Sequence, residues 1–208
     1  MAGITLQSLS WCFVLLCTCS GTEQIAAANR PLRTVDVVAA DVLRAAKVPG
    51  GIEVITGCNQ FVASSFDVTS GLVDNTLASL SRSDPSLSWY KRGNRYTVTI
   101  KGVSAPSLTS AKLPALKMKV KTLSEATDLL LQQKGTQDRI AELKLVGAPD
   151  ELGFSSIHER DVRQISLPAG TLQDDLNALA AAFGAAVWHL DQRQCGGSRT
   201  FRLSWIAK

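Results

Sequence analysis

The chain contains one stretch that occurs twice. Residues 66–92, FDVTSGLVDNTLASLSRSDPSLSWYKR, align without a gap on residues 165–191, ISLPAGTLQDDLNALAAAFGAAVWHLD. Each stretch reads as strand, glycine turn, short amphipathic helix and aromatic-led strand, which predicts one unit used twice. The alternative is coincidence between two ordinary α+β segments. The identical aligned pairs are Gly71 and Gly170, Leu77 and Leu176, Leu80 and Leu179, and Trp89 and Trp188.

Length and composition fit a folded chain of two small domains. The chain has 208 residues, of which 45% are hydrophobic and 19% charged, unlike a disordered sequence. The formal net charge of +4 comes from scattered lysines and arginines, with no basic run that alternates with aromatic residues. Nucleic acid is therefore not an expected partner.

The first residues have the layout of a signal peptide. The apolar run LSWCFVLLCTCSG is too short to span a membrane, and Ala26, Ala27 and Ala28 follow it. We expect residues 1–28 to be a leader cleaved after Ala28, so that the mature chain is exported and has no spanning segment. An uncleaved anchor, or a lipoprotein modified at Cys17 or Cys19, is the alternative.

Cysteine usage agrees with export. Outside the leader only Cys58 and Cys195 remain. In an oxidising compartment they could form one disulfide that ties the two units together, or stay as two free thiols. Neither has a companion at metal-ligand spacing, so we expect no metal site.

The first unit is expected over residues 32–101. Its predicted elements are a strand at Thr34–Val38, a helix at 39–46, strands at 51–56 and 64–71, a helix after Gly71 and a hairpin over 87–100. In the strand 51–56, Ile52 and Val54 are expected on one face and Glu53 on the other. Residues 102–115, rich in serine, proline and alanine, are expected to be an exposed linker.

The second unit is expected over residues 116–206. Its first strand, LKMKVK, alternates apolar residues with Lys117, Lys119 and Lys121; these lysines could meet an acidic partner or protect an edge strand. A helix over 124–133 capped by Thr122 or Ser124, a strand over 139–147 and a polar loop over 147–161 should follow. The repeated stretch and a last hairpin, which turns at Gly196 and Gly197, close the unit. The expected fold class is thus α+β, with two small βαββαβ-type sandwich units in tandem.

Residues 37–100 resemble a known family, the secretin and TonB-receptor short N-terminal domain. The resemblance rests on four segments: Val68–Gly71, the helix with Leu77 and Leu80, Leu87–Tyr90, and Arg95–Val98. It covers about residues 34–100 and, more weakly, 116–205. It implies a βαββαβ sandwich, a periplasmic location and partners such as a secretin, a TonB-dependent receptor or a sigma-regulator component. The channel that follows this domain in the family, and the sequence that contacts TonB, have no counterpart here, so the resemblance implies a module without channel activity.

No catalytic or cofactor motif is present: GxSxG, the phosphate loop, HExxH and CxxC are all missing. His158 beside Glu159 lacks a nucleophile, and His189 is expected on a strand surface. We therefore expect a protein-interaction module, with no enzymatic activity and no cofactor, and as the alternative a small-molecule or glycan-binding protein. The residues expected to contact a partner are Trp205, Phe201, Lys117, Lys119 and Lys121.

Overall fold

A computed structural model describes residues 33–58, 72–148, 162–184 and 186–206. These residues form a mixed arrangement of helices and strands, so the α+β prediction is confirmed. The expected leader, the strand at 64–71 and His158 lie outside the described residues. Among the helices of the described part, none has the length and apolar character needed to cross a membrane.

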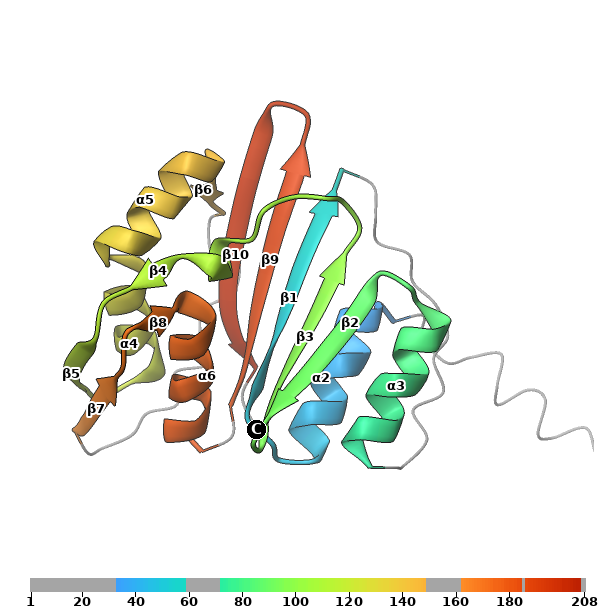
Figure 1. Ribbon diagram of the computed structural model, residues 1–208, viewed down its shortest axis with the longest axis horizontal. Coiled ribbons are helices and arrows are strands. Elements are labelled where there is room, and N and C mark those ends of the chain that lie inside the picture. Colours follow the sequence, from blue (N-terminus) through green and yellow to red (C-terminus); the bar gives the residue numbers. More distant parts are fainter. Residues whose placement is uncertain (1–32, 59–71, 149–161, 185, 207–208) are drawn as a thin grey trace, which may run out of the picture. The chain divides into compact units, whose positions relative to one another are not determined.

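The centre is a sheet of six strands in the order β2-β3-β1-β9-β10-β6 (Figure 1). Strand β1 pairs in parallel with β3 on one side and with β9 on the other, while β2–β3 and β9–β10 are antiparallel hairpins. Strands of both expected units thus share one sheet, and the tandem arrangement of separate sandwiches is not confirmed. The bounds are β1 Gly50–Gly57, β2 Leu87–Arg92, β3 Arg95–Lys101, β6 Val146–Gly147, β9 Val187–Cys195 and β10 Ser198–Ile206.

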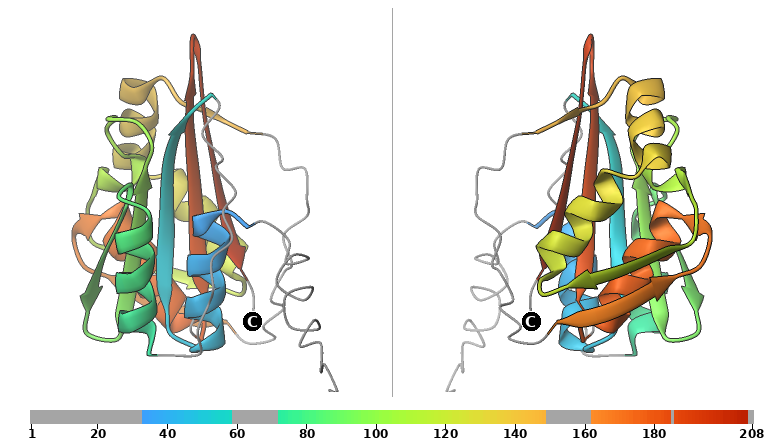
Figure 2. Two further views of the ribbon diagram at one scale, coloured as in Figure 1. Left: turned by 90° about the vertical axis from the view of Figure 1, so that its right-hand side faces the viewer. Right: turned by 90° about the vertical axis from the view of Figure 1, so that its left-hand side faces the viewer.

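The two faces of this sheet carry separate hydrophobic clusters. Val187 of β9 belongs to one cluster, and its neighbour Trp188 belongs to the other. Successive side chains of a strand point to opposite faces, so the clusters lie on opposite sides of the sheet. Helices α2 (Val35–Ala45) and α3 (Val73–Ser83) cover the first face, and α6 (Leu172–Ala182) covers the second; Figure 2 shows α2 and α6 on opposite sides of β9.

The second cluster is completed by a small subassembly beside the sheet. Two helices and two short ribbons build it, and the ribbons pair β4 with β8 and β5 with β7, both antiparallel. The elements are a 3-10 turn at Leu108–Ser110, β4 Lys112–Leu113, β5 Leu116–Val120, α4 Leu123–Leu131, α5 Lys134–Leu143, β7 Arg163–Leu167 and β8 Gly170–Thr171.

Two predicted strands are wrong. The segment Thr34–Val38 was expected to be extended, but α2 begins at Val35, because Val35, Val38 and Val42 also recur at helical spacing and are buried together. The segment 139–147 was expected to be a strand, but α5 runs to Leu143. Only Val146–Gly147 is extended, where it pairs with β10.

The expected linker is part of the core. Within residues 102–115, Leu108, Ala111 and Leu113 are buried in the second cluster. The backbone N–H of Leu172, at the start of α6, donates a hydrogen bond to the carbonyl of Ala111. Serine, proline and alanine in this segment therefore mark an irregular path through the subassembly, and the prediction of an exposed joint is wrong.

Candidate interaction surface

The lysine row lies on the outer face of the β5–β7 ribbon. Met118 and Val120 of β5 are buried in the second cluster, whereas Lys117 and Lys119 alternate with them and are exposed. Opposite these two lysines, β7 places Ser166 and Gln164, both exposed and neither able to neutralise an ammonium group.

Lys121 extends the row beyond the end of β5. It is exposed, and its backbone N–H donates to the Glu125 carboxylate at 2.8 Å. That carboxylate is part of the start of α4, where Thr122 accepts from the Glu125 N–H; the predicted cap at Thr122 is thereby confirmed. No salt bridge joins the side chain of Lys117, Lys119 or Lys121 to a carboxylate of the described residues. We call these three residues the lysine row.

The ribbon that carries the lysine row has only two strands. Each strand therefore has one edge that no other strand of the described residues pairs with. Such an edge exposes alternating backbone N–H and C=O groups, which are suited to pair with an added strand. Residues that alternate apolar and acidic along an added strand would place their acidic side chains beside the lysine row.

The two aromatic candidates occupy a different place. Phe201 is only 9% exposed and belongs to the second cluster. Trp205 is half-buried against the same cluster, and its indole N–H donates to the Thr127 hydroxyl of α4 at 2.8 Å. At Thr200 and Phe201 the outer edge of β10 pairs with β6. The structure therefore brings the three lysines together, and gives Phe201 and Trp205 contacts inside the protein.

A histidine and an aspartate form a pair that the sequence analysis missed. Nε2 of His189 on β9 lies 3.1 Å from Oδ2 of Asp36 on α2. Burial by itself raises the pKa of Asp36, but the hydrogen bond and charge of His189 help to leave it below its usual value. Ser204 lies opposite His189 on β10, and its hydroxyl donates to the backbone carbonyl of His189 at 3.5 Å. The pair thus joins α2 to the sheet, and within the described part of the chain no hydroxyl or thiol is recorded as a hydrogen-bond partner of the His189 ring.

A second polar group fills the junction between the two expected units. Glu53 lies on the face opposite Ile52 and Val54, as expected, but it is only 3% exposed and accepts hydrogen bonds from the hydroxyls of Ser107 and Thr109. Burial raises the pKa of Glu53, against the effect of these bonds. Gln192 of β9 accepts from the Leu108 N–H at 3.0 Å. These contacts hold residues 107–109 against the sheet. The sequence signal for them was a single acidic residue within the otherwise uncharged strand GGIEVIT, residues 50–56.

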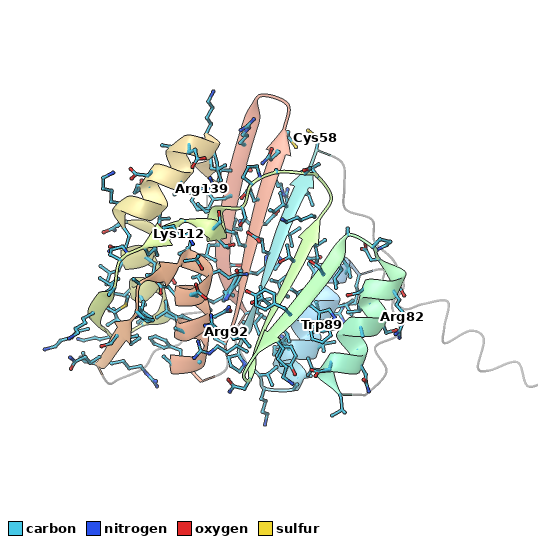
Figure 3. The ribbon with its side chains drawn as sticks, in the orientation of Figure 1. Cys58, Arg82, Trp89, Arg92, Lys112 and Arg139 are labelled. Carbon is cyan, nitrogen blue, oxygen red and sulfur yellow. The ribbon has the colours of Figure 1, made fainter. Side chains whose placement is uncertain are left out.

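The side-chain view places the labelled residues on distinct parts of the molecule (Figure 3). Trp89 lies on β2 toward α3, whereas Lys112 and Arg139 lie on β4 and α5. Cys58 lies at the end of β1. Both Cys58 and Cys195 are free thiols, and no group of three metal-ligating side chains occurs among the residues that the structure describes.

Comparisons of the chain with protein-family models, with curated proteins and with solved structures find no match.

Proposed function

We propose that this chain is an exported protein-interaction module that contacts an acidic segment of a cell-envelope protein through the lysine row. The observation that carries the proposal is the lysine row, with Lys117 and Lys119 on the outer face of the ribbon and Lys121 just beyond it. All three side chains are exposed, and no salt bridge joins them to a carboxylate of the described residues. Uncompensated charge of one sign on a protein surface favours association with a partner of the opposite sign.

The ribbon also suggests how the partner binds. A partner strand that pairs with an open edge of β5 or β7 gains backbone hydrogen bonds, and the lysine row selects for acidic side chains on its outer face. The buried side of the ribbon, with Met118, Val120 and Ile165, stays packed on the second cluster and keeps the edge rigid. The interaction then needs no refolding of the module.

Location and architecture are part of the proposal. The leader layout of residues 1–28 supports export, and the resemblance of residues 34–100 to the short N-terminal domain of secretins and TonB-dependent receptors supports a periplasmic interaction module. We propose that the helix-hairpin segments α3–β2–β3 and α6–β9–β10 are two divergent copies of one unit. Their support is the aligned leucines and tryptophans and the common order of elements.

A photo-crosslinking experiment tests the contact. A photoreactive amino acid replaces Lys119 in one protein and Lys134, an exposed residue of α5, in another. Both proteins are expressed with their own leader and irradiated in intact cells. We expect one defined envelope protein to crosslink to position 119 and not to position 134.

Charge reversal shows whether that adduct reports the proposed contact. With the probe moved to Gln164, the K117E/K119E/K121E protein should lose about tenfold or more of the adduct, because three attractions become repulsions. A control protein with the same change in charge, K47E/K134E/K144E, should keep it, since these three lysines are also exposed but lie outside the ribbon. No adduct from position 119, or equal loss in both triple variants, would contradict the proposed contact.

The leader is tested separately. Residues 1–31 fused to a reporter enzyme that is active only outside the cytoplasm should give activity, and the same fusion without residues 11–19 should give none. A reporter that is inactive in both fusions would refute export and leave the binding surface untouched.

A further inference from the structure

The two cysteines of the described chain meet at the end of the central parallel strand pair. Strands β1 and β9 pair in register as far as Gly57 and Gln194. Cys58 is the next residue after Gly57, and Cys195 is the next after Gln194. Continuing the register by one residue therefore sets the two cysteines opposite each other.

Their side chains also point to the same side. Alternation along β1 places Cys58 on the face of Ile52 and Val54, and alternation along β9 places Cys195 on the face of Val187 and His189. Both sets belong to the face covered by α2. The Cys58 side chain raises the pKa of the Cys195 thiol, which agrees with two side chains that lie close together on this face.

The spacing of neighbouring strands suits a disulfide. Paired strands lie about 4.8 Å apart, and disulfides join Cα atoms that are about 4.4–6.8 Å apart. We propose that Cys58 and Cys195 are a redox pair that closes into an intramolecular disulfide and locks β1 to β9. The bond would join the end of β1, in the first expected unit, to the end of β9, the first strand of the last hairpin.

The oxidant is a second disulfide, small or protein-borne. The Cys58 thiol is exposed and gives up its proton, and its sulfur attacks one sulfur of the donor, which releases the first donor thiol. Cys195 then loses its proton and attacks the sulfur of Cys58, which releases the second donor thiol. Two cysteine thiols are thereby oxidised by two electrons, and one donor disulfide is reduced to two thiols.

Cys195 is suited to the second step. The hydrogen bond with Cys58 and partial burial raise the pKa of the Cys195 thiol, so it forms a thiolate less readily than an ordinary cysteine. Once Cys58 is in the mixed disulfide, that hydrogen bond is lost and the sulfur of Cys58 becomes the electrophile directly opposite Cys195. Intramolecular closure is then favoured over attack by a second molecule of thiol.

Peptide mapping of the full chain tests the bond directly. The protein is treated with oxidised glutathione, its remaining thiols are blocked, and it is digested with trypsin without reduction. We expect peptide 48–82, which contains Cys58, to be joined to peptide 194–199, which contains Cys195, with the loss of two hydrogen atoms. The link should disappear after dithiothreitol. Glutathione adducts on both peptides without a link, or links to the leader peptide or between two chains, would overturn the proposal.

Thermal unfolding gives a second readout. Oxidation should raise the melting temperature by about 5 °C or more, because the bond closes a loop that spans most of the described chain. Cys195→Ser should abolish this rise, and Cys19→Ser, a control outside the described residues, should keep it. Both variants are first compared with the parent under reducing conditions, where equal melting temperatures show that they fold. A linked peptide without any rise in melting temperature would overturn the lock while leaving the bond.

Discussion

The two helix-hairpin segments, α3–β2–β3 and α6–β9–β10, have the same local architecture and different surroundings. In each, an eleven-residue helix buries two leucines, Leu77 and Leu80 or Leu176 and Leu179, over the strand that follows. The aligned tryptophans lie near the start of each first strand, Trp89 as the third residue of β2 and Trp188 as the second residue of β9. Trp89 is on the edge strand β2 and half-buried, however, whereas Trp188 is on the inner strand β9 and 0% exposed.

The difference arises from the way each hairpin meets β1. In the segment α3–β2–β3, the last strand, β3, pairs in parallel with β1, and β2 therefore runs antiparallel to β1. In the segment α6–β9–β10, the first strand, β9, is the one that pairs in parallel with β1. The segments therefore lie on the sheet in opposite directions, with their helices on opposite faces. One local pattern can thus serve both faces of a single sheet, and its position in the sheet decides which of its residues become core.

The largest expected effect comes from the two tryptophans. Trp188 packs over Gly51, where an added Cβ would come within 1.7 Å of the indole Cε2, and its N–H donates to Asn177 at 2.9 Å. Trp188→Ala should lower the free energy of unfolding by about 4 kcal/mol, because it leaves a cavity and an unpaired amide. Trp89→Ala should lower it by about 1 to 2 kcal/mol, since part of that ring is already in water. Urea unfolding followed by far-UV circular dichroism measures both.

Trp188→Phe separates packing from hydrogen bonding. It keeps most of the ring over Gly51 and removes the donor to Asn177, so its cost should fall between those of the two alanine variants. If Trp89→Ala and Trp188→Ala cost the same, the proposed distinction between edge and inner hairpin is wrong.

The next effect concerns a position where the two helices differ in charge. Asp175 is 1% exposed, and both of its carboxylate oxygens lack a hydrogen-bond partner among the described residues. Thr76, aligned with it in α3, donates its hydroxyl to the carbonyl of Leu72 at 3.3 Å. Burial, together with the charge of Asp174, raises the pKa of Asp175 to about 6. The second helix therefore carries a buried group that destabilises it once charged.

The sign of the pH dependence follows from that pKa. The pKa of about 6 in the folded protein exceeds the ordinary aspartate pKa of 3.8. Folding therefore takes up a proton between these pH values, and stability falls as the pH rises from about 4 to about 6. The total loss is about 3 kcal/mol. Asp175→Asn should be as stable as the parent below pH 4 and about 3 kcal/mol more stable above pH 7. The control Thr76→Ser should change the free energy of unfolding by no more than about 0.5 kcal/mol in either pH range. Equal pH profiles for the parent and Asp175→Asn would contradict this account.

Sequence patterns predicted the local parts of this fold and missed the parts that depend on distant neighbours. The hairpins, α3, α4, α6 and the lysine row follow from periodicity, turn residues and caps within short windows. The pairing of β1 with β9 joins residues more than a hundred positions apart, and no local pattern specifies it. The segment that carries Ser107 and Thr109 packs on one face of β1 and α2 packs on the other, which is why Glu53 is only 3% exposed. The same limit hid the contact between Asp36 and His189.

The smallest effect distinguishes the two helix starts. Thr171 begins α6 with a capping box, in which its hydroxyl accepts from the Asp174 N–H and the Asp174 carboxylate accepts from the Thr171 N–H. The aligned residue of α3 is Leu72, which offers no side-chain cap and is 75% exposed. Thr171→Ala should lower the free energy of unfolding by about 1 kcal/mol, and Leu72→Thr should raise it by about 0.5 to 1 kcal/mol, because only the second helix already has its first N–H groups satisfied. Chemical denaturation of both variants measures these changes. A Thr171→Ala variant as stable as the parent, or a Leu72→Thr variant with no gain in stability, would contradict the proposed difference between the two helix starts.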